Sequence, residues 1–251
     1  MSWLDDLVEG NYSPKNIEQG SEEWENIRAG RFTSSEMYNL MEFGYRPMTK
    51  QELDARPKTG KGSKTTRIID PNSLSEKART YITQKVGEVL TGQAEASAYA
   101  YPLIYGKEME PEAVEYFEKV TGHTCEEIGF QTWGDHAGGS PDRIIQGIKE
   151  GLEIKCPINS KNQVKYLMLT DHHDLKSNYP EYYWQCVSLM LFMGFDAWNF
   201  CTYDPRMISD KHKMTFMRIE ASKVDEDMDL INVALNTAIK EKLVMLNLLN
   251  K

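Results

Sequence analysis

The stretch Gly138–Pro157, GGSPDRIIQGIKEGLEIKCP, decides the fold of this chain. Two apolar-rich runs, GSPDRII and GLEIKC, flank the short glycine-bounded connection QGIKE, and this pattern predicts a β-hairpin. Because side chains alternate between the two faces of a strand, Glu153 and Lys155 share one face. Leu152 and Ile154 take the opposite face, which we expect to pack against the core.

The hairpin brings three ionisable side chains together, because Asp142 lies on its first strand and Glu153 and Lys155 lie on its second. Two acids and a lysine backed by an apolar face are unfavourable unless something neutralises the acids. A divalent metal ion would do so. The alternative is an ordinary solvated hairpin, and the hairpin alone leaves both interpretations open.

A second acid-x-lysine triplet, Asp174-Leu175-Lys176, occurs downstream. It lies in the polar segment LTDHHDLKSN, which has no strand pattern, so its context favours the triplet that ends at Lys155. The neighbouring pair His172-His173 is predicted to lie on a surface connector and not at a metal site.

The composition excludes several classes of protein. The 251 residues are 40% hydrophobic and 10% aromatic, as in a folded globular protein, and can form one domain spanning residues 1–251. A net charge of −9 argues against a surface that coats nucleic acid, so any DNA contact must be local. No apolar run is long enough to cross a membrane, and the start MSWLDDLVEG has no signal-peptide pattern. We therefore expect a cytoplasmic protein.

The four cysteines, Cys125, Cys156, Cys186 and Cys201, are widely spaced and form no C-x-x-C pair. This spacing favours reduced thiols in the core over disulfides or a zinc site. An iron–sulfur site built from distant cysteines is a minor alternative.

The segment SEEWENIRAG predicts a helix that begins after Ser21. The residues Thr33-Ser34-Ser35-Glu36 match a capping box and predict a second helix. The turn between them would bring Arg28 near Ser35 at a helix N-terminus, an arrangement that can bind an anion. A plain helical turn with a solvated Arg28 is the alternative.

Further helices are predicted at about Leu74–Leu90, Tyr105–Val120 and Pro180–Met193, with a long closing helix after residue 222. Strands are predicted at AWNFCTYD and MTFMRIEAS. Two polar residues are conspicuous: Glu110 lies at the polar–apolar border of its helix, and Gln185 lies among apolar neighbours. Each is a candidate site residue or an ordinary structural one.

Residues 45–73 are predicted to form a flexible loop that is rich in basic residues. Its role is open between an arm that follows a phosphate backbone and a solvated loop. The basic residues of this loop are Arg56, Lys58, Lys61, Lys64 and Arg67.

Six short blocks, taken together and in order, resemble the phage lambda exonuclease or YqaJ-type viral recombinase family of the PD-(D/E)xK nuclease superfamily. The blocks are WENIRAGRFTSSE at 24–36, YGKEMEPEA at 105–113, GGSPDRI at 138–144, GLEIKCP at 151–157, YYWQ at 182–185 and YDPRM at 203–207. The resemblance implies an α/β (α+β) fold, in which a central mixed β-sheet is flanked by helices.

The resemblance also implies roles for individual residues. The catalytic residues would be Asp142, Glu153, Lys155 and Glu110. The metal ligands would be Glu110, Asp142, Glu153 and the main-chain carbonyl of Ile154. The residues that bind the terminal 5′ phosphate of DNA would be Arg28, Ser35, Ser140 and Gln185.

The implied activity is Mg²⁺-dependent 5′→3′ digestion of one strand of linear double-stranded DNA, which leaves 3′ overhangs for annealing-type recombination. Two Mg²⁺ ions are expected, with Mn²⁺ as a substitute. The implied partners are duplex DNA ends, a single-strand annealing protein and further copies of the chain in a homotrimer, in a bacterial host of a phage or prophage. The alternatives are a structure-specific or iron–sulfur endonuclease of the same superfamily, or a non-catalytic DNA-binding protein. Because all four metal and lysine positions are filled, the last alternative is disfavoured.

Overall fold

The computed structural model describes residues 20–55, 67–95 and 101–250. Its helices are α2 (Glu22–Arg28), η1 (Ser34–Asn39, a 3-10 helix), α3 (Lys50–Asp54), α4 (Glu76–Thr91), α5 (Tyr101–Thr121), α6 (Ser160–Leu167), α7 (His172–Asn178), α8 (Pro180–Met193), α9 (Asp210–Lys213), η2 (Ala221–Lys223, 3-10) and α10 (Asp225–Leu249). Its strands are β1 (Phe32–Thr33), β2 (Phe43–Pro47), β3 (Arg67–Leu74), β4 (Cys125–Glu126), β5 (Gln131–Trp133), β6 (Ala137–Gly139), β7 (Arg143–Ile145), β8 (Glu150–Lys155), β9 (Ala197–Tyr203) and β10 (Met214–Glu220).

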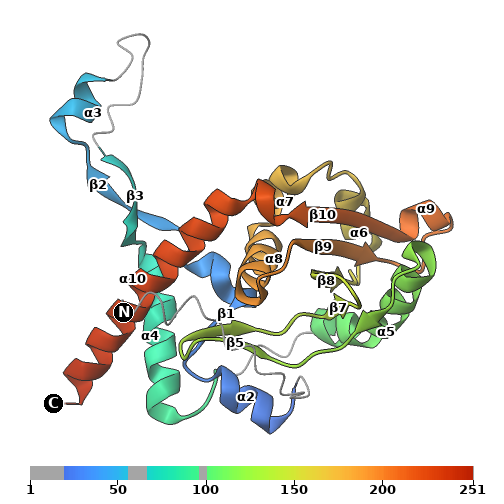
Figure 1. Ribbon diagram of the computed structural model, residues 1–251, viewed down its shortest axis with the longest axis horizontal. Helices are drawn as coiled ribbons and strands as arrows, with labels where there is room; N and C mark the ends of the chain where they lie inside the picture. The colour runs from blue at the N-terminus through green and yellow to red at the C-terminus, as the bar shows by residue number, and fades with distance from the viewer. Residues whose placement is uncertain (1–19, 56–66, 96–100, 251) are drawn as a thin grey trace.

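A five-stranded mixed sheet forms the centre of the molecule, in the order β10-β9-β8-β7-β4 (Figure 1). Strands β8 and β9 are parallel, whereas the other neighbours in this sheet are antiparallel. The predicted hairpin is confirmed as β7 and β8, in which Arg143 pairs with Leu152 and Ile144 with Gly151. The mixed α/β fold class inferred from the sequence is therefore confirmed.

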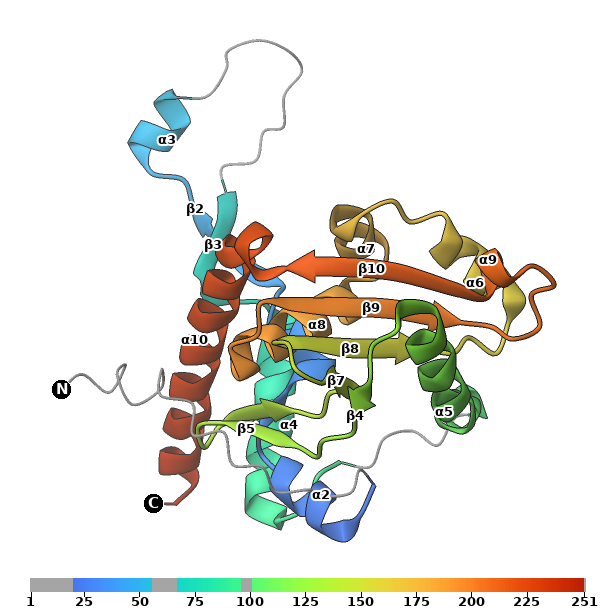
Figure 2. The same ribbon diagram turned by 45° about the vertical axis from the view of Figure 1, so that its right-hand side comes forward.

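The two faces of this sheet pack against different helices (Figure 2). On one face, Leu152 and Ile154 of β8 pack with Ala113 and Phe117 of α5. On the other face, a larger cluster joins Phe200 of β9 to residues of α8, α10, α4 and η1. Burying apolar side chains on both faces of β8 and β9 stabilises these strands at the centre of the sheet.

A smaller sheet in the order β1-β6-β5 places the N-terminal strand β1 beside β6, which shortly precedes the hairpin. Strand β1 pairs in parallel with β6, with Thr33 beside Gly138. A Cβ atom at Gly139 would lie 2.2 Å from Ser34 Oγ, so this close packing requires glycine. The segment after β1 was predicted to be an α-helix with a capping box, but it is the 3-10 helix η1, and the Thr33 side chain makes no capping hydrogen bond.

The region 45–73 differs from its predicted flexible loop. Strands β2 and β3 form an antiparallel two-stranded ribbon, and α3 follows β2, so that an arm projects from the body (Figure 1). The observed capping box lies here, between Thr49 and Glu52. Residues 56–66, which carry most of the predicted basic run, lie outside the described residues.

Most predicted helices are confirmed, with shifted ends. Helix α8 has the predicted bounds, α4 begins after its N-cap Ser75, and α5 begins at Tyr101, before its predicted start. The four cysteines are free thiols, and only Cys125 is not buried. Among the helices that the structure describes, none has the length and apolar character required to span a membrane.

Candidate active site

The hairpin fixes the carboxylate of Asp142 against the adjacent strand. Asp142 directly precedes β7, and its Oδ2 accepts a 2.7 Å hydrogen bond from the main-chain N–H of Ile154 on β8. A carboxylate that accepts a main-chain N–H keeps its orientation without a counter-ion. The carbonyl oxygen of the same residue, Ile154, belongs to the predicted ligand set.

Glu153 and Lys155 lie on the face of β8 opposite to the α5 cluster, as the alternation predicts. Glu153 is fully buried, and the Lys155 ammonium donates a hydrogen bond to its Oε1. The Lys155 ammonium also lies 5.2 Å from the centroid of the Tyr182 ring on α8. The other oxygen of Glu153, Oε2, is buried without a hydrogen-bond partner. A buried carboxylate oxygen without a partner is unfavourable, so Glu153 favours an additional cation or proton.

Glu110 projects from α5 into the same region. Its Oε1 accepts a 2.7 Å hydrogen bond from Arg143 Nη1, and both side chains are largely buried. Arg143 also donates to the main-chain oxygen of Asp142, and its Nη2 lies 3.7 Å from Glu127. Arg143 therefore links α5 to the start of β7.

The pKa values show that these groups share one electrostatic environment. Burial and the neighbouring Asp142 raise the pKa of Glu153 to about 8 and the pKa of Glu110 to about 7. Burial also raises the pKa of Asp142. Burial alone would lower the pKa of Lys155, but the charges of Glu153 and Asp142 raise it above its ordinary value. Three carboxyl groups, one fully and two partly buried, beside one lysine are typical of a functional site.

These residues fit a divalent cation, although they are not arranged as a complete metal cage. In residues 20–55, 67–95 and 101–250, no group of three or more His, Cys, Asp or Glu side chains is placed to hold a metal ion. Main-chain N–H, lysine and arginine donors contact the carboxylates of Asp142, Glu153 and Glu110. The unpartnered Oε2 of Glu153 and the repulsion among the acids nevertheless favour added positive charge. Oxygen ligands of this kind are those that Mg²⁺ and Mn²⁺ prefer.

Two of the residues predicted to bind the 5′ phosphate are connected through Trp24. The indole N–H of Trp24 donates a 2.8 Å hydrogen bond to Ser140 Oγ. The guanidinium carbon of Arg28 lies 3.9 Å from the centroid of the Trp24 ring. Ser140 follows β6 and stands two residues before Asp142, so this group is joined directly to the carboxylate cluster.

A buried polar network fixes the turn that follows Arg28. Gly30 has φ of +74°, and its N–H donates to Glu88 Oε2 at 2.9 Å. The Gly30 carbonyl accepts a 2.7 Å hydrogen bond from Lys242 of α10, and Lys85 forms a 2.8 Å ion pair with Glu88. Because both main-chain polar groups of Gly30 have buried partners, the turn between α2 and β1 is fixed against α4 and α10.

The other two residues predicted to bind the 5′ phosphate are Ser35 and Gln185. Ser35 lies in η1, and its Oγ is 3.4 Å from Oγ1 of Thr33 at the end of β1. Gln185 lies on α8, one turn before Leu189, whose side chain packs at Gly139. Among the described residues, the amide of Gln185 makes no hydrogen bond.

Sequence reasoning missed Arg143 as a contact of the acidic cluster and Trp24 as the link between Arg28 and Ser140. The signal for Arg143 was its position directly after Asp142 in SPDR. The signal for Trp24 was its position four residues before Arg28 on one helix, where side chains are neighbours.

The second acid-x-lysine triplet has a structural role, as its context predicts. It lies on α7, where Leu175 is buried and Lys176 forms a 2.7 Å ion pair with Asp227 of α10. The pair His172-His173 was predicted to lie on a surface connector, but it opens this helix, with ring centroids 4.1 Å apart.

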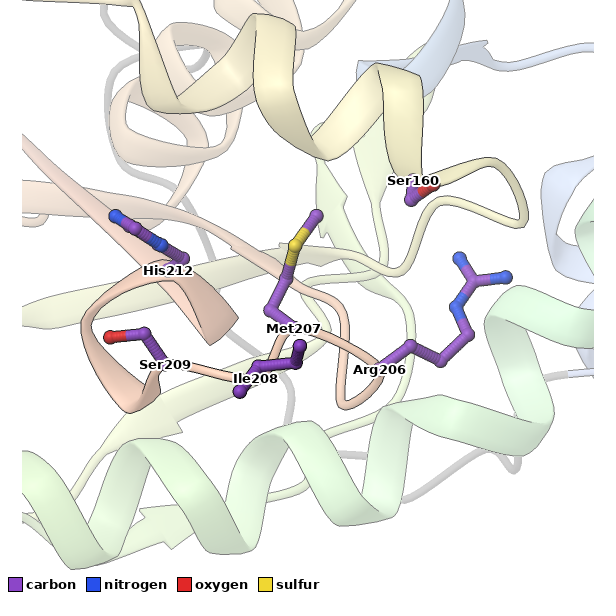
Figure 3. A pocket seen from close by; sticks show the side chains of 6 residues that line it. All are labelled: Ser160, Arg206, Met207, Ile208, Ser209 and His212. Carbon is purple, nitrogen blue, oxygen red and sulfur yellow. The ribbon is translucent and has the colours of Figure 1, made fainter.

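A hollow of about 480 Å³ is lined by none of the predicted site residues. Figure 3 shows the side chains that line it. Arg206, which lines it, donates hydrogen bonds to the carbonyls of Pro157 and Ile158, just beyond the end of β8. The hollow is lined by Ser160, Arg206, Met207, Ile208, Ser209 and His212. Arg206 thereby braces the chain that leaves the site, but the hollow contains none of the acidic cluster.

The fold is similar to those of two bacterial or phage-related exonucleases. The alkaline exonuclease LHK-Exo from Laribacter hongkongensis superposes with a TM-score of 0.66 at 23% identity, over 92% of this chain and 96% of that one. The same enzyme has been solved in complex with dAMP, with a TM-score of 0.65 at 24% identity, over 91% and 96% of the two chains. A phage-related exonuclease from Haemophilus somnus 129PT superposes with a TM-score of 0.64 at 14% identity, over 90% and 99%.

Comparison by sequence gives a family assignment. No curated protein sequence matches the chain. The model of the YqaJ-like viral recombinase domain matches residues 23–196, which include nearly all of α2, the carboxylate hairpin and all of α8. The protein therefore belongs to the YqaJ-like viral recombinase family.

Proposed function

We propose that this protein is a divalent-metal-dependent exonuclease that digests one strand of linear double-stranded DNA from its 5′ end. The observation that carries the proposal is the convergence of Asp142, Glu153 and Lys155 on one hairpin, with Glu110 beside them. The family and the exonuclease relatives support a nuclease, and the dAMP complex of LHK-Exo agrees with release of mononucleotides.

The ligands of the metal would be Asp142, Glu153, Glu110 and the carbonyl of Ile154. A bound Mg²⁺ or Mn²⁺ supplies charge neutralisation for the phosphate under attack and for the entering and leaving oxygens. In the reaction, water attacks the phosphorus and the bond from phosphorus to the leaving oxygen breaks.

The protein's own groups neutralise the charge of the transition state and orient a metal ligand. The Lys155 ammonium, held by Glu153, provides a fixed positive charge for the anionic transition state. The hydrogen bond from Ile154 fixes the Asp142 carboxylate, so little reorganisation is needed when the phosphate arrives.

Selection of an end over an interior bond is assigned to Arg28, Ser140, Ser35 and Gln185. A terminal phosphate carries an extra negative charge, which a planar guanidinium and hydroxyl donors match. Trp24 contacts both Arg28 and Ser140, which places these two donors beside one another at the start of the hairpin.

The proposal extends to assembly and location. We infer a homotrimer, a single-strand annealing protein as partner and a cytoplasmic site of action in a phage-infected or prophage-bearing bacterium. A trimer that encloses duplex DNA would reconcile processive digestion with the net charge of −9, because DNA contacts would be confined to the enclosed surface.

The deciding experiment compares linear with covalently closed circular duplex DNA, in Mg²⁺ and in chelator, with separate labels on the 5′ and 3′ ends. We expect the linear duplex to lose its 5′ label first, as a mononucleotide, and the closed circle to persist. Nicking or linearisation of the circle would instead support an endonuclease, and digestion in chelator would contradict the role of the metal.

A matched pair of variants tests end selection. Arg28→Ala should remove the preference for 5′-phosphorylated over 5′-hydroxyl ends. Arg79→Ala removes a surface arginine that pairs with Glu241 on α10, away from the hairpin, and should keep the preference. An unchanged preference in the Arg28 variant would overturn the phosphate assignment.

A further inference from the structure

Arg143 is the charged neighbour of the acidic cluster to which the proposed reaction gives no role. It lies in β7, opposite Leu152 of β8, and its side chain is only 14% exposed. Its Nη1 donates to Glu110 Oε1 at 2.7 Å and also to the main-chain oxygen of Asp142. The guanidinium is thus held by the two segments that bring Glu110 and Asp142 together.

The three carboxyl groups differ in the partners that they have. Asp142 accepts from a main-chain N–H, and Glu153 accepts from Lys155. Glu110 accepts from Arg143, the one cationic group within hydrogen-bonding distance of it among the described residues. The carboxylate of Glu110 therefore depends on Arg143 for neutralisation.

We propose that Arg143 is a positioning residue that acts as the counter-ion of Glu110 and competes with the divalent cation for this carboxylate. The inference rests on the proposed function, because the cation is the one that the nuclease would use. A guanidinium is always charged, so it repels a nearby metal ion as well as occupying the carboxylate oxygen. Both effects weaken metal binding, and both disappear when the charge at position 143 is removed.

Arg143 also has a stabilising effect when no metal is bound. A buried carboxylate that loses its cationic partner destabilises the folded protein. Removal of Arg143 should therefore lower stability in chelator and increase the stabilisation that the metal produces. An arginine with only a structural role would change the stability in chelator and leave the stabilisation produced by the metal unchanged.

The test is a calorimetric titration of the full chain with Mn²⁺, without DNA, at neutral pH, with thermal unfolding in chelator and in saturating Mn²⁺. In Arg143→Gln we expect Mn²⁺ to bind about ten- to a hundredfold more tightly, the range that one hydrogen bond to a charged group implies. Arg143→Lys should give an intermediate affinity, because lysine keeps the charge but makes fewer directed hydrogen bonds. If Arg143→Gln does not fold, Arg143→Lys must still bind Mn²⁺ more tightly than the wild-type protein.

Two further variants make the result specific. Arg218→Gln breaks another arginine–glutamate pair on the same sheet, at 2.8 Å from Glu150, and should leave Mn²⁺ affinity unchanged. In a Glu110→Gln background, adding Arg143→Gln should change the affinity by less than about twofold, because the contested carboxylate is absent.

The outcomes separate the two proposals. If the unchanged protein binds Mn²⁺ but Arg143→Gln binds it equally or more weakly, Arg143 does not compete, and the inference alone is overturned. If the unchanged protein neither binds Mn²⁺ nor digests DNA, the proposed function falls, and the inference falls with it.

Discussion

The carboxylate of Asp142 accepts the main-chain N–H of Ile154 at 2.7 Å across the two strands of the hairpin. This contact joins the residue before β7 to the middle of the Glu153-Ile154-Lys155 triplet. It orients one proposed metal ligand through the backbone of another, so the geometry of the acidic cluster is set by strand pairing and not by side-chain flexibility.

Lys155→Ala should abolish digestion of linear duplex DNA while leaving DNA binding within a few-fold. The substitution removes the positive charge that stabilises the transition state and leaves Glu153 buried without its partner. Digestion of end-labelled duplex and electrophoretic mobility shift measure the two effects. Lys176→Ala, in the other acid-x-lysine triplet, is the control and should retain activity; full activity in the Lys155 variant would refute the mechanism.

Trp24→Phe and Ser140→Ala should each reduce the preference for 5′-phosphorylated ends, and to a similar extent. Each change breaks the same 2.8 Å hydrogen bond, while phenylalanine retains a ring beneath Arg28. The double variant should lose little more than either single variant, because the two residues act through one contact. Independent, additive losses would show that Trp24 does not act through Ser140.

Gly139→Ala should destabilise the protein by at least about 2 kcal/mol, since the new Cβ would lie 2.2 Å from Ser34 Oγ and 2.7 Å from a Leu189 methyl group. Gly87→Ala is the matched control on α4, where a Cβ meets nothing within 4 Å. It should stabilise by about 0.5–1 kcal/mol through helix propensity. Urea unfolding measures both changes, and equal stabilities of the two variants would contradict the close packing of η1 on β6.

Lys242 should make the stability depend on pH between about 8 and its ordinary pKa. Burial, followed by the charges of Arg31 and Lys85, lowers the pKa of Lys242 from 10.5 to about 8 against the opposing effect of Glu88. In this window the folded protein binds fewer protons than the unfolded chain, so the contribution of Lys242 to stability rises with pH. The stability of the unchanged protein relative to Lys242→Met should therefore increase from pH 8 to pH 9.5 in urea unfolding. A constant difference would mean that the lysine titrates normally in its contact with Gly30.

Local patterns in the sequence were sufficient to predict the hairpin, the faces of Glu153 and Lys155, and the bounds of α8. Strand alternation and helix periodicity depend on near neighbours in the chain, so they can be recognised without the fold. The residues themselves suggested Glu110, Gln185 and the turn between Arg28 and Ser35 as candidates, and the family resemblance added Ser140 and the expected role of each. The segment after β1 was predicted wrongly as an α-helix, because close packing of Ser34 on Gly139 is a long-range constraint that local capping patterns do not contain.

Only the tertiary structure decided which charges meet. Trp24 lies 116 positions from Ser140, and Arg143 lies 33 positions from Glu110, so no local rule pairs them. The region 45–73 was likewise predicted to be a loop, because the pairing of β2 with β3 joins segments that are separated in the chain. The sequence by itself determined the hairpin GGSPDRIIQGIKEGLEIKCP and its three ionisable residues. The fold decided their partners, because burial removes water and makes each charge depend on whichever group the distant parts of the chain bring within reach.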